Sequence, residues 1–265
     1  MDGELILRVD GDVLMVADLA DPSGRTLAAA GLWEWNVGAA IQRILRPGDV
    51  FMDVGANTGY YSVLAARLVG PQGHVYALEP APRTYAVLQR NVALNGFGNR
   101  VSAIEAAAGA ERGSATLFGP ALGHDASSSL RRQPDATSKN ATMVDVQPLC
   151  DVLAPEHRDG LRLVKIDVEG HEDDVLVGLE PALTDGPLPT LIVEVHAEWN
   201  PGAARFVLDF CARHGYRAHW IAEDTGSADE GLAPVDRELV LEDVGDPPDL
   251  SRIRRARYAL LLEAR

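Results

Sequence analysis

The segment DVGANTGYYSVLA at 53–65 constrains the fold of this chain more than any other feature. It runs from a strand-like apolar stretch, through a turn with two glycines, into a stretch whose apolar residues have helical spacing. The same alternation continues, with helix-like segments between further expected strands at 74–80, 101–109, 143–149, 161–170, 190–196 and 257–265. Strands separated in this way predict an α/β fold with a mostly parallel sheet and right-handed crossovers.

The length of the chain is consistent with one domain, because 265 residues with 46% hydrophobic composition can form a single large α/β core. Within a domain covering 1–265, we expect a β-hairpin and helix at 1–47. A cofactor-binding core follows at 48–196, and a helix with closing strands at 197–265. The segment 113–142 breaks the alternation and is rich in Ser, Gly and Pro, which predicts a long loop that is either a functional lid or partly disordered.

Charge and composition exclude several classes of partner. A net charge of −15 argues against nucleic acid, because binding to phosphates needs clustered Lys and Arg, and the basic cluster at 252–257 is interpreted as a solvated helix end. No apolar run reaches the roughly 18 residues of a membrane span, so no membrane partner is expected. The N-terminal pattern predicts strands rather than a signal peptide, and neither Cys150 nor Cys211 has CxxC or His spacing. A cytoplasmic location fits these features.

The glycine turn differs from the turn that binds dinucleotides. A dinucleotide fold needs G-x-G-x-x-G, whereas the sequence from Gly55 reads GANTGY, with Asn57 and Tyr60 at the second and third glycine positions. The features that admit a pyrophosphate are therefore missing, which disfavours a nicotinamide oxidoreductase. A turn from Asp53 to Gly59 with a helix start behind it suits a compact nucleoside cofactor with an amino-acid end, such as S-adenosylmethionine.

Two acidic residues at expected strand ends are candidates for the nucleoside. Glu79 follows Gly55 by 24 residues, close to the roughly 20-residue offset at which an acidic group meets ribose hydroxyls. Glu105 ends the next strand, where it either approaches the adenine edge or is merely solvated. In the long loop, the hydroxyls of 127–129, Ser128 among them, could contact donor or acceptor if the loop closes.

Five segments occur in a fixed order between about 49 and 196: DVGANTGYYSVLA, VYALEP, NVALNG, LVKIDVEGHEDDVLVGL and LIVEVH. In these segments the chain resembles the FkbM family of class I S-adenosylmethionine-dependent methyltransferases. The resemblance implies a Rossmann-like fold with a seven-stranded, mostly parallel sheet whose last strand is antiparallel. It also implies S-adenosylmethionine as methyl donor and, usually, a hydroxyl acceptor on a natural product or sugar.

Polar residues follow two of the expected strands at positions where ligands collect in open α/β sheets. Asp167 and Glu169 end the strand at 161–170, and Glu194 and His196 end the strand at 190–196. His196 is the preferred general base, because imidazole has a pKa close to neutral, although a lone histidine is also often structural. Asp167 either orients that histidine, contacts the donor or caps the following helix.

Two further expectations concern charged groups near these strand ends. Lys165 lies between apolar neighbours, and we expect its ammonium to snorkel or to pair with an acid. Asp167, Glu169, His171 and His196 offer oxygen and nitrogen ligands, but their spacing matches no strong metal motif, so no metal is expected.

The sequence leaves three functions open. The first is an O-methyltransferase acting on a hydroxyl of a small or medium natural product or a sugar-containing metabolite. The second keeps the donor but methylates nitrogen, carbon or a carboxylate, which needs no general base. The third is a regulatory module that binds a nucleoside without turnover. One of Trp33 and Trp35 is expected to pack in the core while the other lines an acceptor pocket, and exposed tryptophans with the N-terminal strands could pair two chains into a homodimer.

Overall fold

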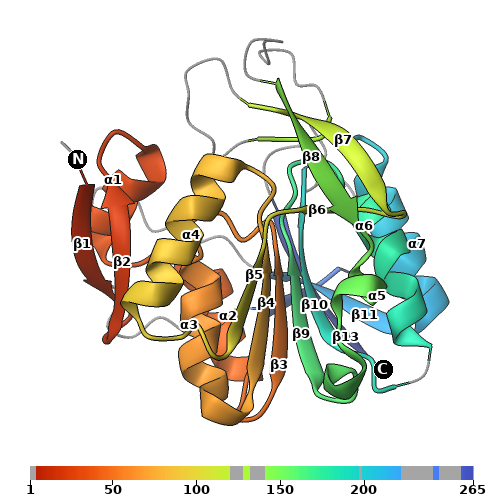
Figure 1. Cartoon of the computed structure of the whole chain (residues 1–265). Coiled ribbons are helices and arrows are strands. Elements are labelled where there is room, and N and C mark those ends of the chain that lie inside the picture. Colours follow the sequence, from red (N-terminus) through yellow and green to blue (C-terminus); the bar gives the residue numbers. More distant parts are fainter. Residues whose placement is uncertain are drawn as a thin grey trace.

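The computed structural model describes residues 4–119, 128–131, 141–184, 186–196, 199–221, 241–244 and 258–264. Its main sheet has the strand order β12-β11-β13-β10-β9-β3-β4-β5 (Figure 1). The strands are β3 (Val50–Val54), β4 (His74–Leu78), β5 (Val101–Ile104), β9 (Leu161–Ile166), β10 (Thr190–Val195), β11 (Tyr216–Ile221), β12 (Leu241–Asp243) and β13 (Tyr258–Ala264). The basic cluster at 252–257 lies outside the described residues.

The sheet is mostly parallel with an antiparallel last strand, as predicted. The neighbours β5, β4, β3, β9 and β10 run parallel, and β13 is inserted antiparallel between β10 and β11. The count differs from the expected seven because the short strand β12 pairs with the outer edge of β11. Every residue of β3 and β10 is buried, as expected for strands covered on both faces.

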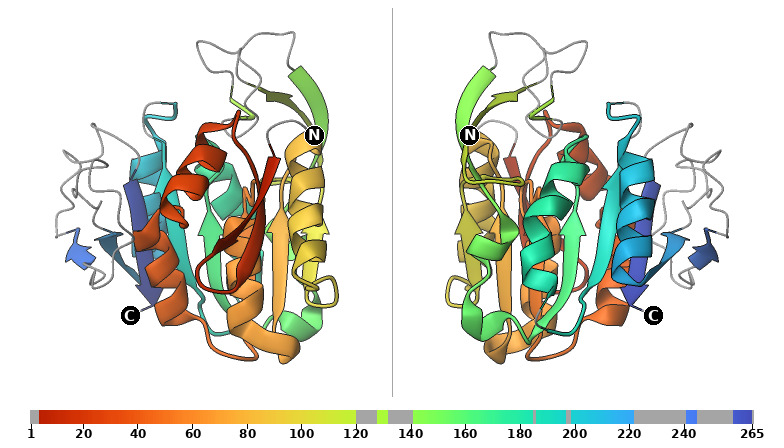
Figure 2. Two further views of the ribbon diagram at one scale, coloured as in Figure 1. Left: turned by 90° about the vertical axis from the view of Figure 1, so that its left-hand side faces the viewer. Right: turned by 90° about the vertical axis from the view of Figure 1, so that its right-hand side faces the viewer.

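Helices cover both faces of the sheet (Figure 2). On one face, α2 (Trp35–Ile44), α3 (Tyr60–Val69) and α4 (Pro82–Leu94) enclose a core that contains Phe51 and Leu163. On the other, α5 (Leu149–Val152), α6 (Glu172–Leu179) and α7 (Ala203–His214) enclose a core that contains Met52 and Val164. Neighbouring residues of one strand therefore face opposite cores, as the period of two requires. Among the described residues, no helix combines the length and the apolar character needed to cross a membrane.

The N-terminal segment forms the expected hairpin from β1 (Glu4–Val9) and β2 (Val13–Asp18), and then adds an unexpected helix, α1 (Pro22–Ala30). The hairpin lies against α4. The side-chain oxygens of Asn91 on α4 and of Asn95, the residue directly after it, accept hydrogen bonds from the backbone N–H groups of Val16 at 2.8 Å and Leu14 at 2.9 Å. These bonds fix the hairpin to α4, beside the main sheet.

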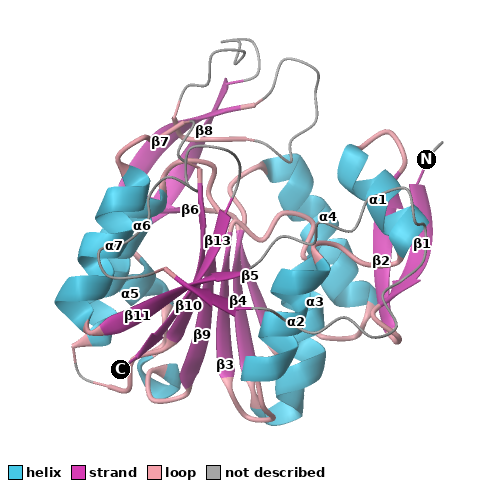
Figure 3. Cartoon of the chain, turned by 180° about the vertical axis from the view of Figure 1, so that it is seen from behind, coloured by secondary structure: helices cyan, strands magenta, loops and turns pink. Residues whose placement is uncertain are grey.

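Two expectations about the middle of the chain were wrong. They placed 143–149 in the main sheet and included 113–118 in a long loop at 113–142; of the rest of that loop, 120–127 and 132–140 lie outside the described residues. Instead, β6 (Ala107–Ala108), β7 (Gly113–Phe118) and β8 (Ala141–Gln147) form a separate three-stranded sheet beyond one end of the main sheet (Figure 3). The expected strand at 101–109 is split into β5 and β6, because β6 leaves the main sheet to pair with β8.

Candidate active site

The glycine turn after β3 is held by close contacts of the backbone. Gly55 has φ +77°, and its N–H and that of Ala56 donate to the carbonyl of Leu78 on β4 at 3.0 and 2.8 Å. A Cβ atom at Gly55 would lie 1.9 Å from the carbonyl oxygen of Asp167. Gly59 starts α3 at φ +88°, and a Cβ there would lie 2.4 Å from the side chain of Leu88. Both glycines are therefore required by the packing of the turn.

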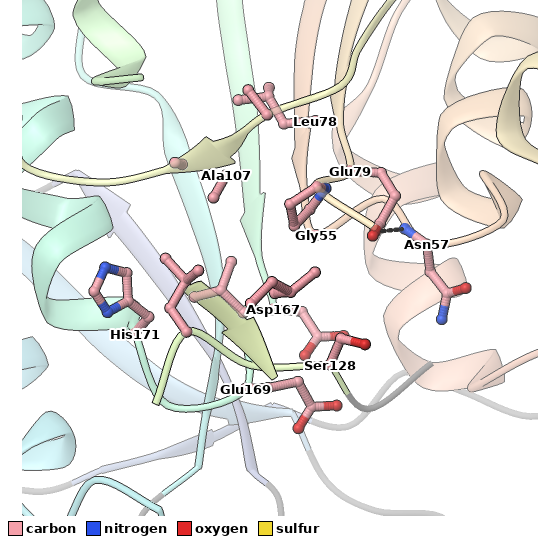
Figure 4. A pocket seen from close by; sticks show the side chains of 15 residues that line it. Gly55, Asn57, Leu78, Glu79, Ala107, Ser128, Asp167, Glu169 and His171 are labelled. Carbon is pink, nitrogen blue, oxygen red and sulfur yellow. Dashed lines mark hydrogen bonds between the residues drawn. The ribbon is translucent and has the colours of Figure 1, made fainter. Parts of the chain in front are cut away.

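Glu79 is fixed at the end of β4 by two backbone groups. Its Oε2 accepts the N–H of Asn57 at 2.9 Å and its Oε1 accepts the N–H of Ala81 at 2.9 Å, while only 7% of the residue is exposed (Figure 4). The bond to Asn57 joins the carboxylate to the glycine turn. A carboxylate oriented in this way has further lone pairs with which to accept hydroxyl protons.

A first cavity lies beside this carboxylate and contains most of the residues predicted to bind the cofactor. Gly55, Asn57, Glu79 and Ser128 line it, together with Asp167 and Glu169 (Figure 4). The remaining lining is largely apolar and comes from Leu78, Ala106, Ala107, Ala108, Leu117 and Leu130. A carboxylate at one side and an apolar slot at the other fit a nucleoside, with the ribose on Glu79 and the adenine between the apolar side chains.

Three residues predicted to bind the cofactor do not line this cavity. Asp53 is 0% exposed, and its Oδ2 accepts the hydroxyl proton of Ser62 at 2.6 Å inside the α3 side of the core. Gly59 lies at the helix start, and Glu105 is exposed beside the cavity rather than in it. Asp53 and Gly59 thus shape the turn, and their contact with the cofactor stays a prediction.

His171 lines the first cavity, although the sequence suggested only a metal role for it. Its Nδ1 lies 3.1 Å from Asp174 Oδ2, and the two belong to a group with Asp173 rather than with Asp167. Its position directly after the glycine of KIDVEGHE was the available signal. Of the three serines in the loop, 127 lies outside the described residues and Ser129 is buried, donating its hydroxyl to the backbone carbonyl of Glu169 at 2.6 Å.

A second cavity lies on the other side of the glycine turn, with a volume of 210 Å³. The segment at 21–34 lines it from one side, including Trp33, while Tyr60 and Tyr61 of α3 line it from another. This matches the expectation that one of the two tryptophans lines a pocket. Four residues, Gly55, Asn57, Asp167 and Glu169, line both cavities. The two cavities therefore meet at the glycine turn and the end of β9.

His196 lies between the two carboxylates of this junction. Its Nε2 lies 3.1 Å from Asp167 Oδ1 and its Nδ1 lies 3.4 Å from Glu169 Oε2, so the imidazole faces an acid on each side. Burial alone would lower the pKa of His196, but the hydrogen bond and charge of Asp167, with the charges of Glu169 and Glu172, raise it to about 9. The ring of Trp199 stacks on it at 4.9 Å.

These observations argue against His196 as the general base. It is 1% exposed and lines neither cavity, and an imidazole with a pKa near 9 is already protonated at neutral pH. A protonated ring cannot accept the proton of an acceptor hydroxyl. The contact predicted between Asp167 and the histidine is present, but it serves to hold an imidazolium in place.

Lys165 pairs with an acid, as expected. Its Nζ lies 3.1 Å from Asp167 Oδ2, 4.0 Å from Glu194 Oε1 and 4.9 Å from the centre of the Tyr61 ring. Burial opposes its charge, yet the carboxylates of Asp167 and Glu194 raise the pKa of the ammonium above its usual value. Burial likewise opposes the charge of Asp167, but Lys165 and His196 hold its pKa far below the usual range.

The donor set permits a metal without requiring one. One ligand atom from each of Asp167, Glu169 and His196 lies within 4.8 Å of the others. Both imidazole nitrogens of His196, however, already lie at hydrogen-bond or ion-pair distance from carboxylates, so the three side chains hold one another without an ion. The expectation that no metal is needed stays a prediction.

Comparison with known proteins assigns the family. Residues 53–218 match the family described as Methyltransferase FkbM domain. The chain is 34% identical over 199 residues to 31-O-demethyl-FK506 methyltransferase FkbM of Streptomyces tacrolimicus, a match covering 65% of this chain and 74% of the relative. It is 32% identical to Methyltransferase sdnD of Sordaria araneosa, covering 60% and 70%.

Solved structures show the fold alone. A methyltransferase FkbM from Methylobacillus flagellatus KT superimposes with a TM-score of 0.50 at 16% identity, covering 91% of this chain and 54% of that one. A putative rRNA-methylase from Clostridium thermocellum gives a TM-score of 0.50 at 11% identity, covering 86% and 93%. The family match, which covers more than half of the sequence, leads to one conclusion: the chain belongs to the FkbM methyltransferase family, and it is an S-adenosylmethionine-dependent methyltransferase.

Proposed function

We propose that this methyltransferase transfers a methyl group to a hydroxyl of a small or medium natural product or a sugar-containing metabolite. One observation carries the proposal: the nucleoside cavity and the second cavity meet at Gly55, Asn57, Asp167 and Glu169. A donor in the first cavity and an acceptor in the second would thus approach each other beside two carboxylates. The relative from Streptomyces tacrolimicus, named as a 31-O-demethyl-FK506 methyltransferase, supports an oxygen acceptor.

The residues of the first cavity have distinct roles in binding S-adenosylmethionine. Glu79 would accept the ribose hydroxyl protons, the apolar side chains would enclose the adenine, and the turn at Gly55 and Asn57 would admit the amino-acid end. When bound, the cofactor supplies a methyl carbon whose bond to sulfur breaks as the bond to the acceptor oxygen forms. The protein has to hold that oxygen in line and take up its proton.

Glu169 is the residue we assign to the acceptor proton. It lines both cavities, 8% of it is exposed, and its backbone is held in the left-handed region at φ +54°. The hydroxyl of Ser129 fixes its carbonyl, and the imidazolium of His196 lies 3.4 Å from its carboxylate. We therefore assign His196 as a positioning residue that orients Glu169 and Asp167, which both line the junction.

The test is methyl transfer to a panel of hydroxylated acceptors, with formation of S-adenosylhomocysteine and the acceptor's gain of one methyl group followed together by mass spectrometry. Transfer to oxygen that is lost in Glu169→Gln, with unchanged affinity for S-adenosylhomocysteine, would support the proposal. Fragmentation that places the methyl on nitrogen, carbon or a carboxylate would favour the second function instead. In that case Glu169→Gln should retain activity, because an acceptor that is already nucleophilic needs no base.

A further inference from the structure

The second cavity also carries information about the chemistry of the acceptor. This inference rests on the proposed function, because it concerns the molecule that the second cavity takes. Four carboxylates line the cavity, from Asp21, Glu34, Asp167 and Glu169, whereas Lys165 is the one basic residue among its described lining residues. The side chain of Lys165 is 1% exposed and its ammonium lies 3.1 Å from Asp167. The imidazolium of His196 lies between Asp167 and Glu169, so Asp21 and Glu34 are the lining carboxylates that form no ion pair with a described residue.

Glu34 extends into this cavity from the start of α2. It lies in the left-handed region at φ +38°, and its side chain makes no capping bond to the helix that it precedes. Instead, its Oε2 accepts the hydroxyl proton of Tyr61 at 2.8 Å. A carboxylate has about four lone-pair sites, so one bond from Tyr61 orients the group and leaves it able to accept others.

Backbone strain is concentrated around the same cavity. Four non-glycine residues among the described ones have positive φ: Asp10, Glu34, Asn57 and Glu169. Three of these, Glu34, Asn57 and Glu169, line the second cavity. Strained backbone of this kind collects at ligand sites, where it fixes the direction of a side chain. Glu34 and Glu169 thus present fixed carboxylates from the N-terminal segment and from the end of β9.

Aromatic rings accompany these carboxylates. Trp33 precedes Glu34 in the lining, and Tyr60 and Tyr61 follow from the first turn of α3. Tyr61 already receives a cation, since the ammonium of Lys165 lies 4.9 Å from its ring centre. Carboxylates and aromatic faces together bind organic cations, through charge-assisted hydrogen bonds and cation–π contacts. Anionic groups meet repulsion in such a space.

We propose that the second cavity takes an acceptor that carries a protonated amine in addition to its hydroxyl, such as an amino sugar, and that Glu34 binds this amine. The hydroxyl then faces Glu169 at the junction of the two cavities, and the amine lies on the N-terminal side. Acceptors bearing a carboxylate or a phosphate are rejected.

The experiment measures acceptor binding without turnover. The protein is saturated with S-adenosylhomocysteine and titrated in a calorimeter with three probes on one ring: methyl 2-amino-2-deoxyglucopyranoside, methyl glucopyranoside and methyl glucopyranosiduronate. We expect the amine to bind about tenfold tighter than the neutral ring and the uronate not to bind. Glu34→Gln, whose amide oxygen can still accept the Tyr61 proton, should reduce the affinity for the amine to that of the neutral ring. The exposed Glu111→Gln serves as matched control and should change nothing.

Equal affinity of the wild-type protein for the amine and the neutral ring, or binding of none of the three probes, would overturn the proposal. The proposal would also be overturned if Glu34→Gln bound S-adenosylhomocysteine more weakly but still bound the amine more tightly than the neutral ring, because Glu34 would then belong to the donor site. The proposed function fails separately. An amine preference that depends on Glu34 without methylation of oxygen leaves the cavity assignment standing and overturns only the O-methyltransferase assignment.

Discussion

His196 Nε2 lies 3.1 Å from Asp167 Oδ1, and this pair joins the ends of β9 and β10 at the floor of the site. The same Asp167 binds Lys165 through its other oxygen at 3.1 Å. One carboxylate therefore separates two buried cations and stabilises both. The pair links fold stability to the geometry of the site, because the ring that holds Glu169 is itself held by Asp167.

The pH dependence of stability follows from the raised pKa of His196. Its pKa in the folded protein is about 9, against an ordinary value of 6.5 for the free side chain. The folded state thus binds the proton more tightly, which stabilises it fully below about pH 6.5, and this contribution is lost as the pH rises through about 9. We expect a loss of about 3 kcal/mol at most in the free energy of unfolding, measured by urea denaturation between pH 6 and 10. In His196→Gln the free energy of unfolding should not fall in this way between pH 6 and 10. The same pH dependence in both proteins would contradict a raised pKa of His196.

Glu172 should also make the folded state less stable as the pH rises, but over a lower pH range than His196. It is 0% exposed, its Oε1 accepts the N–H of Gly170 at 2.9 Å, and burial raises its pKa to about 7, although the charge of His196 opposes the shift. Its ionisation therefore destabilises the folded state as the pH rises from about 4.5 through 7. At pH 8, Glu172→Gln, which keeps the acceptor for Gly170, should have a free energy of unfolding about 1–2 kcal/mol higher than the wild type and so unfold at a higher urea concentration. At pH 4.5 the two proteins should be equally stable. A destabilised variant at pH 8 would show that the ionised group is needed.

The parallel sheet could be predicted because it is encoded in local patterns. Apolar residues predominate in the strands β3, β9 and β10, and turn residues mark their ends. The convergence of Asp167, Glu169 and His196 followed from their positions at the carboxyl ends of neighbouring strands. Alternation could also have placed Asp53, since it shares the side of β3 with Phe51 and so faces Ser62 in the core.

Other features depend on tertiary packing that no local pattern records. The segment 143–149 has the apolar pattern of a strand, but the pattern does not state which sheet the strand joins, and β8 pairs with β6 and β7. Glu34 gave no signal because its position in the second cavity depends on how the hairpin and α1 dock on the sheet. The raised pKa of His196 could not be read from the sequence for a related reason, since it depends on acids up to 29 residues away in the chain.

Gly55 should be sensitive to any side chain. A methyl group there would lie 1.9 Å from the carbonyl oxygen of Asp167, in addition to the strain of φ +77°. Gly31 provides a matched control, because it has φ +69° and a methyl group there would have nothing within 4 Å of it. Gly31→Ala should lower the free energy of unfolding by about 1 kcal/mol, because alanine there is strained by the positive φ but meets no steric clash. Gly55→Ala should cost at least about 3 kcal/mol and abolish binding of S-adenosylhomocysteine, by urea denaturation and calorimetry. Equal costs for the two variants would show that the turn can relax.

Glu79 and Glu105 follow neighbouring strands, but Glu79 is buried beside the first cavity whereas Glu105 is exposed. Glu79 lines the first cavity and accepts two backbone N–H groups at 2.9 Å, whereas Glu105 is exposed and lines neither cavity. Glu79→Gln loses the charge and exchanges one acceptor oxygen for a donor that faces a backbone N–H. It should weaken S-adenosylhomocysteine by about tenfold or more, because a hydrogen bond to a charged group contributes about 1.5–3 kcal/mol. Glu105→Gln should leave the affinity within about twofold in the same titration. A comparable loss in both variants would mean that Glu105 reaches the adenine after all and that the cavity closes around the cofactor when it binds.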